Sequence, residues 1–190
     1  MRELSLNVLD VAQNSLTAGA TLTQILVQED TAQQRLTIQI IDNGKGMTAE
    51  QVAHVMDPFY TTRTTRKVGL GVPLFKLAAE QTGGSLSIQS TPGQGTQVTA
   101  VFCTGSIDMT PLGDINATVA MLVRCNPERD FVFRRGIDGR CLLLDTRQLR
   151  QVLGDEVALD SPDVMEWVEG FLQEQTQALL RGENPGGIGD

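Results

Sequence analysis

The chain has 190 residues, of which 41% are hydrophobic, which suits one globular domain with a small appendage and excludes a disordered protein. Its net charge of -8, with no basic stripe, argues against a nucleic-acid partner because acidic surfaces repel phosphate backbones. No apolar run reaches the roughly 18 residues of a membrane span, and the first residues do not resemble a signal peptide. We therefore expect a cytoplasmic protein without a membrane partner.

Three cysteines, Cys103, Cys125 and Cys141, are isolated along the chain and lack the spacing of a metal site. An odd number of isolated cysteines in a cytoplasmic protein indicates reduced thiols. Because free cysteine is commonly buried, we expect all three in or near the core.

Residues 4–18 are predicted to form a helix, because apolar side chains recur at every third or fourth position. Asn7, Asp10 and Asn14 follow the same spacing on another side and make a polar stripe. Gly19 provides a stop in the left-handed conformation that glycine adopts easily. The stripe is either the solvated face of a surface helix or one wall of a site, and the helical pattern alone does not distinguish these interpretations.

Two strands follow, Thr23–Glu29 and Leu36–Ile41, and the second leads into the glycine-containing segment Asp42–Met47. Asn43-Gly44 alone could be a hairpin turn. However, Thr48–Gln51 has the pattern of a capping box and opens a short helix, so the glycines connect a strand to a helix. A carboxylate followed by two glycines lets a flat ligand or a phosphate approach the backbone, which predicts the floor of a nucleotide site.

A second glycine-containing segment precedes a helix that is predicted to start near Pro73. Gly69 and Gly71 lie just ahead of this helix, where unpaired N–H groups and the helix dipole favour phosphate. Arg63 and Lys67 add positive charge nearby. The alternative is a solvated loop with scattered basic residues. The segment matches neither a P-loop nor a dinucleotide fingerprint.

Two further strands, Ser85–Ser90 and Gln97–Phe102, are joined by turn-forming residues at 91–96. Four strands with three helices on one face predict a two-layer α/β sandwich of the α+β class, built on a mixed sheet.

The chain from about Arg2 to Phe102 resembles the histidine-kinase-like ATP-binding domain of the GHKL superfamily, which includes sensor kinases, gyrase, the MutL mismatch-repair protein and a heat-shock chaperone. Four motifs occur in the family's order and spacing. They resemble the N box at residues 10–21, the first glycine box at 42–47, the F box with the second glycine box at 57–63 and 69–72, and the final box at 95–96. The resemblance implies the Bergerat fold and a freestanding ATP-binding domain over residues 1–105, similar to sensor kinases or anti-sigma-factor kinases.

The resemblance also assigns roles to the matching positions. Asn14 would ligate a magnesium ion that bridges the phosphates of ATP, and Asp42 would accept a hydrogen bond from the exocyclic amine of adenine. Thr96 would support Asp42, usually through water. The remaining nucleotide contacts would come from Gly44, Gly46, Met47, Phe59, Thr61, Thr62, Arg63, Lys67, Gly69, Leu70, Gly71 and Val72. Residues 61–68 would form a mobile lid.

Departures from the family pattern bear on catalysis. The general base, commonly Glu four residues before the magnesium Asn, is Asp10 here, whose shorter side chain has less reach toward an attacking water. Only 13 residues precede Asn14, so we expect no dimerising hairpin with a phosphorylated histidine upstream. The single histidine, His54, has no neighbouring acidic motif and is expected to be solvated. A phosphoacceptor is therefore expected on another protein.

Residues 106–181 are predicted to form a small C-terminal α/β extension, followed by a disordered tail at 182–190. Its patterns predict helices at 114–123, 146–153 and from 161 onward, and strands at 131–134 and 141–144. Residues 111–190 contain 8 Lys and Arg against 14 Asp and Glu. The extension either supports the ATP-binding domain or docks a protein partner, for which its acidic character and Trp167 are suitable.

Three functions are compatible with these patterns. The favoured one is an ATP-binding regulatory protein of signal transduction that transfers the γ-phosphate to a separate protein, which would make it a protein kinase. The alternatives are a nucleotide-gated binding switch without turnover, and a slow ATP hydrolase similar to MutL and gyrase. Asp10 and the lack of a recognisable second domain with a catalytic lysine disfavour the hydrolase. A homodimer is compatible with the sequence.

Overall fold

The computed structural model describes residues 3–57 and 70–186 of the chain, and every predicted helix and strand is present with ends that differ by a few residues. The strands are β1 (Leu22–Asp30), β2 (Arg35–Asp42), β3 (Ser85–Thr91), β4 (Gly95–Cys103), β5 (Asp130–Ile137) and β6 (Arg140–Asp145). The helices are α1 (Leu4–Thr17), α2 (Ala49–Met56), α3 (Gly71–Gln81), α4 (Ile115–Cys125), α5 (Thr146–Leu153) and α6 (Pro162–Leu180).

All described strands form one mixed sheet in the order β3-β4-β2-β1-β5-β6. Strand β1 pairs antiparallel with β2 and parallel with β5, so the sheet continues from the predicted ATP-binding domain into the predicted extension. The division near residue 105 stays a prediction. In the described residues, no helix is both long and apolar enough to cross a membrane.

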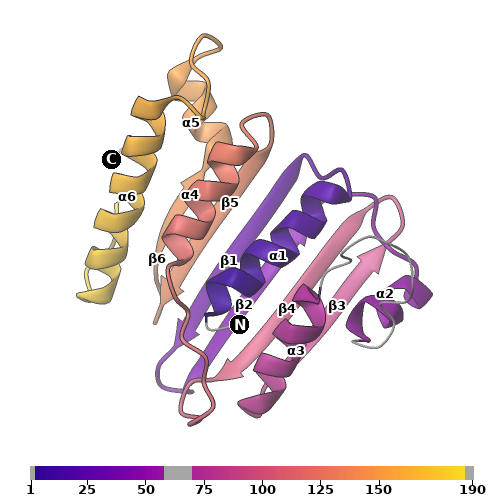
Figure 1. Ribbon diagram of the computed structural model, residues 1–190. Coiled ribbons are helices and arrows are strands. Elements are labelled where there is room, and N and C mark those ends of the chain that lie inside the picture. Colours follow the sequence, from indigo (N-terminus) through magenta and orange to yellow (C-terminus); the bar gives the residue numbers. More distant parts are fainter. Residues whose placement is uncertain (1–2, 58–69, 187–190) are drawn as a thin grey trace.

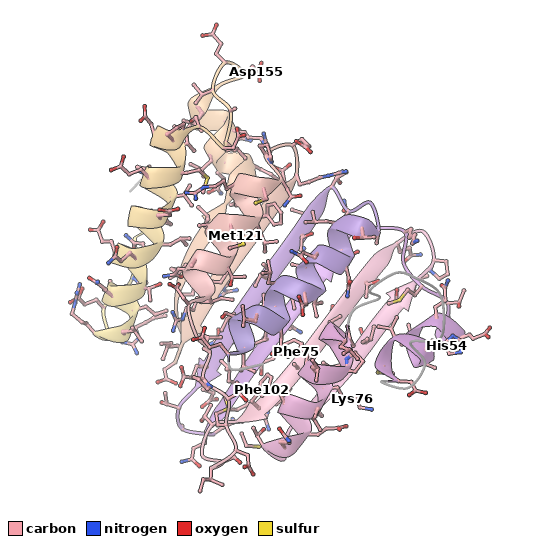
Figure 2. All side chains as sticks on the ribbon, in the orientation of Figure 1. His54, Phe75, Lys76, Phe102, Met121 and Asp155 are labelled. Carbon is pink, nitrogen blue, oxygen red and sulfur yellow. The ribbon has the colours of Figure 1, made fainter. Side chains whose placement is uncertain are left out.

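The helices α1, α3 and α4 lie across the same face of the sheet (Figure 1). Strand β2 shows the resulting alternation, because Leu36, Ile38 and Ile40 are buried while the residues between them are only partly buried. Phe75 of α3 packs near Phe102 of β4, with ring centroids 5.7 Å apart (Figure 2). This single core between two layers confirms the predicted α+β sandwich.

Helix α1 lies between α3 and α4 and contacts both (Figure 1). Its start is held by the segment that precedes α4: the Leu4 N–H donates to the Pro111 carbonyl and the Ser5 N–H to the Leu112 carbonyl, each at 2.9 Å. These bonds satisfy two of the N–H groups that a first helical turn leaves without intrahelical partners. The chain that links the two halves of the sheet therefore fixes the position of α1.

The structure corrects three expectations about single residues. Cys103 and Cys125 are exposed instead of near the core, whereas Cys141 is partly buried. Cys103 follows the buried Phe102 on β4, and strand alternation turns it to the opposite face. His54 lies in the last turn of α2 at the edge of the molecule (Figure 2) and is partly buried, not fully solvated.

Candidate nucleotide site

A cavity of about 190 Å³ lies between the end of α1, the segment after β2, the strands β3 and β4, and the start of α3. Its lining residues are Val11, Asn14, Ser15, Thr17, Ala18, Asp42, Lys45, Gly46, Met47, Val72, Ile88, Thr96 and Val98. The fold thus brings together six of the predicted site residues from separate parts of the chain: Asn14, Asp42, Gly46, Met47, Val72 and Thr96. Apolar side chains form much of the wall, as in sites that hold a flat ring.

The carboxylate of Asp42 has a hydrogen-bond donor on each oxygen. The Ser15 hydroxyl donates to Oδ2 at 2.6 Å, and the Gly44 N–H donates to Oδ1 at 2.8 Å. Ser15 is only 3% exposed, and Asp42 is the last residue of β2. One bond from α1 and one from the following loop therefore fix the orientation of this carboxylate at the cavity wall.

The loop after Asp42 is clamped between α1 and the β3–β4 turn. The Lys45 N–H donates to the Ala18 carbonyl at 3.0 Å, and the Gly93 N–H donates to the Lys45 carbonyl at 2.7 Å. Gly46 has φ +67, and a Cβ there would lie 2.0 Å from the Thr91 carbonyl oxygen. Only glycine fits this contact, so the second glycine of the predicted segment is required by packing as well as by backbone conformation.

Thr96 lies directly opposite Asp42 in the β2–β4 register. Its hydroxyl is 2.8 Å from the Ser90 hydroxyl, whose oxygen also accepts the Met47 N–H at 2.8 Å. Thr96 is therefore linked to the loop through Ser90, whereas the direct supports of Asp42 are Ser15 and the Gly44 N–H. The predicted support of Asp42 by Thr96 through water stays a prediction.

The polar stripe of α1 divides among three environments. Asn14 is exposed and lines the cavity. Asn7 is 1% exposed, and its Nδ2 has no hydrogen-bond partner among the described residues. Asp10 packs against the start of α3, where a Cβ on Gly71 would lie 2.7 Å from the Asp10 Cβ. The stripe is therefore neither uniformly solvated nor uniformly part of the site.

Burial raises the pKa of Asp10 above its ordinary value of 3.8. The neutral form of Asp10 is thus favoured by folding, and that stability is fully present below the ordinary pKa and lost as pH rises through the raised one. We expect Asp10→Asn, which stays neutral, to raise Tm at pH 7 by about 1–2 °C. The gain should shrink as pH falls through the raised pKa and be lost below the ordinary value of 3.8. Thermal unfolding of both proteins between these pH values checks it, and a gain that does not vary with pH would contradict the burial argument.

Part of the predicted site lies at the start of α3 or before it. Leu70 is the N-cap residue of α3 and provides no side-chain cap, and Gly71 and Val72 are its first residues. A first turn without a side-chain acceptor suits a phosphate. The remaining predicted contacts lie outside the described residues, as does the predicted lid at 61–68. These contacts are Phe59, Thr61, Thr62, Arg63, Lys67 and Gly69.

Sequence reasoning missed Ser15, Ser90 and Lys45 as site residues. Ser15 follows Asn14 and is four residues after the apolar Val11, so helical spacing places it on the buried side of α1. A buried hydroxyl requires a hydrogen-bond partner, which was the available signal. Nothing local in the sequence indicates that this partner is Asp42, 27 residues away.

We expect Ser15→Ala to destabilise the chain by about 1–2 kcal/mol, because it removes a short bond to a partly buried carboxylate. It should also weaken ATP binding, since Asp42 keeps only the Gly44 N–H. Denaturant unfolding and ATP titration measure the two effects. Ser87→Ala, on the exposed face of β3, is the matched control and should change neither.

A family model of histidine kinase-, DNA gyrase B-, and HSP90-like ATPases matches residues 1–105, which include the whole cavity lining. The chain belongs to this family. Membership in this ATPase family, with its two-layer fold, supports an ATP-binding regulatory role for the chain. The family resemblance proposed from the sequence motifs is thereby confirmed.

Two of the similar proteins are named as kinases. Sensor histidine kinase ZraS of Klebsiella oxytoca is 38% identical over 61 residues, covering 32% of this chain and 13% of that protein. Sporulation kinase D of Bacillus subtilis is 30% identical over 92 residues, covering 48% and 18%. The chain therefore spans less than a fifth of these two relatives.

A solved structure extends the fold comparison beyond the family match. The crystal structure of the N-terminal domain of a DNA repair protein superposes with a TM-score of 0.54, at 16% identity, covering 82% of this chain and 58% of that one. At this identity the likeness concerns the fold alone.

Proposed function

We propose that the chain binds ATP with magnesium in the cavity and transfers the γ-phosphate to a separate protein. The observation that carries the proposal is the Asp42 carboxylate, held on both oxygens at the wall of a largely apolar cavity. A fixed acceptor suits the exocyclic amine of adenine. It disfavours guanine, which presents a carbonyl there and would leave the carboxylate unpaired.

Asn14 is the residue that would hold magnesium. Its amide is exposed at the cavity wall, and an amide oxygen is a hard ligand that adds no charge. Among the described residues, no group of three or more His, Cys, Asp or Glu could hold a metal alone. Magnesium commonly binds through one or two protein ligands plus substrate phosphates and water. Metal and nucleotide are therefore expected to bind together, and the ion would neutralise phosphate charge.

Transfer to a protein is favoured over hydrolysis by the short side chain of Asp10. Asp10 packs against Gly71 and is one methylene shorter than the Glu that the family commonly has at this position, so its carboxylate reaches less far toward an attacking water. The similarity to a sensor kinase and a sporulation kinase agrees with transfer. Hydrolysis similar to that of MutL and gyrase is the least favoured function.

The second candidate function is a nucleotide-gated switch, which the position of α1 favours. The last turns of α1 carry Asn14 and Ser15, while the same helix contacts α4 and is bonded at its start to Pro111 and Leu112. A nucleotide that shifts α1 would thus act on the C-terminal half directly, without turnover.

Incubation with γ-labelled ATP and magnesium, with and without soluble extract of the source cell, separates these functions. Transfer predicts label on an extract protein that disappears with Asn14→Ala and persists with Gln13→Ala, an exposed neighbour on α1. Binding without label or phosphate release would make the chain a switch and overturn the kinase proposal. Release of phosphate without labelled protein would make it a hydrolase.

A further inference from the structure

Helix α6 exposes the single tryptophan of the chain. Trp167 is 45% exposed even though its ring stacks on Phe171, with centroids 5.0 Å apart and planes 15° apart. The buried side of α6 is formed by other residues, among them Val164, Val168 and Leu172. The aromatic pair therefore lies beside the core contact of the helix, and much of the indole faces solvent.

Gly170 keeps the surface next to Trp167 open. It lies three residues after Trp167 on the same side of α6, and a Cβ there would have no atom within 4 Å. Glycine inside a helix is destabilising relative to alanine, and no packing within the described chain requires it here. Gly170 does allow a bound group to approach the helix backbone closely beside the indole.

Carboxylates flank the aromatic pair along the helix. Asp163 lies one turn before Trp167, and Glu174 lies one turn after Phe171. In the part of the chain that the structure describes, neither carboxylate forms a salt bridge. Arg181 attracts Glu174 electrostatically, but its guanidinium is bonded to both carboxylate oxygens of Glu183. An open indole between unpaired carboxylates has the chemistry that recognises a guanidinium group.

We propose that Asp163, Trp167, Gly170, Phe171 and Glu174 form a shelf that docks an arginine-containing basic segment of a partner protein. The arginine plane stacks on the indole, its stem lies over Gly170, and the flanking carboxylates pair with its charge. The acidic C-terminal half favours a cationic partner over an anionic one. Figure 1 places α6 at the edge of the molecule opposite α2. The shelf can therefore hold a partner without covering the cavity, and only the partner's identity as phosphoacceptor rests on the proposed function.

The test uses a fluorescein-labelled peptide of alternating arginine and glycine, followed by anisotropy, with the full chain and no nucleotide. We expect saturable binding that Trp167→Ala and Glu174→Gln each weaken by about fivefold to tenfold. Binding should also change the emission of Trp167, which is the chain's only tryptophan. A peptide of alternating glutamate and glycine should not bind.

Gly170→Ala is the decisive variant because its two expected effects have opposite signs. Alanine should raise Tm by about 2–4 °C through helix propensity, yet weaken peptide binding by filling the shelf. The charge control, Asp108→Asn with Glu128→Gln, removes two exposed carboxylates outside α6 and should leave binding unchanged.

Three results would contradict the proposed shelf. They are no binding of the arginine peptide, an equal loss of peptide affinity in the charge control, or unchanged peptide binding by Gly170→Ala. Self-association of the chain that Trp167→Ala abolishes would also overturn it, since a second copy would then occupy the surface. Each is measured without ATP, so failure of the shelf is distinguishable from failure of phosphotransfer.

Discussion

Asp42→Asn is expected to weaken ATP binding by roughly 1–3 kcal/mol, about fivefold to 150-fold, with a smaller loss for GTP. The variant keeps the shape of the side chain but replaces a charged acceptor with an amide that also carries a donor. Ser15 and the Gly44 N–H fix the group that faces the base, so it cannot turn away without losing its own bonds.

Titration calorimetry with ATP and with GTP measures this prediction. Folding should persist, because the Gly44 N–H can still donate to the amide oxygen of Asn while the amide nitrogen donates to the Ser15 oxygen, whose own hydrogen can go to the Val11 carbonyl. Thermal unfolding verifies it. Glu50→Gln, an exposed acid in the first turn of α2, removes the same charge and should leave both affinities unchanged. An equal loss of affinity for ATP and GTP would contradict the proposal that Asp42 recognises adenine.

Asn14→Ala is expected to abolish the magnesium dependence of ATP binding without unfolding the chain. Asn14 is exposed at the cavity wall, so its removal should change stability by no more than about 0.5 kcal/mol. If its amide oxygen ligates the ion, ATP affinity in magnesium should fall to the value measured with a chelator.

The measurement compares ATP titrations in magnesium and in chelator for the chain, for Asn14→Ala and for Gln13→Ala. Gln13 is also exposed on α1, one residue before Asn14, and its variant should retain the full magnesium effect. If the magnesium effect persists in Asn14→Ala, Asn14 is not a magnesium ligand and belongs only to the solvated face of α1.

Local patterns were sufficient to predict the loop side of the site. Strand alternation leads to Asp42, and the capping box of Thr48 and Gln51 is present, so the glycine segment joins a strand to a helix as expected. These features depend on residues adjacent in the sequence, where propensity and spacing suffice.

Long-range packing explains what the sequence did not indicate. The parallel pairing of Leu22–Glu29 with Asp130–Ile137 joins the C-terminal strands to the same sheet, whereas local patterns only indicated an extension. The burial of Ser15 and Asn7 depends on how α1 seats between its neighbours, because spacing alone made Asn7 equivalent to Asn14. The usual burial of free cysteine did not predict the exposure of Cys103, because strand alternation decides which face of the sheet its side chain is on.

The location of the bound nucleotide tests the account most directly. A proton–nitrogen NMR titration with magnesium and ATP should shift the amides of Gly44, Lys45 and Gly46, the residues after Asp42, and leave those of α6 in place. If the signals of these three amides do not move, or if the shifts concentrate between α4 and α6, the result would contradict ATP binding in the cavity at the end of α1.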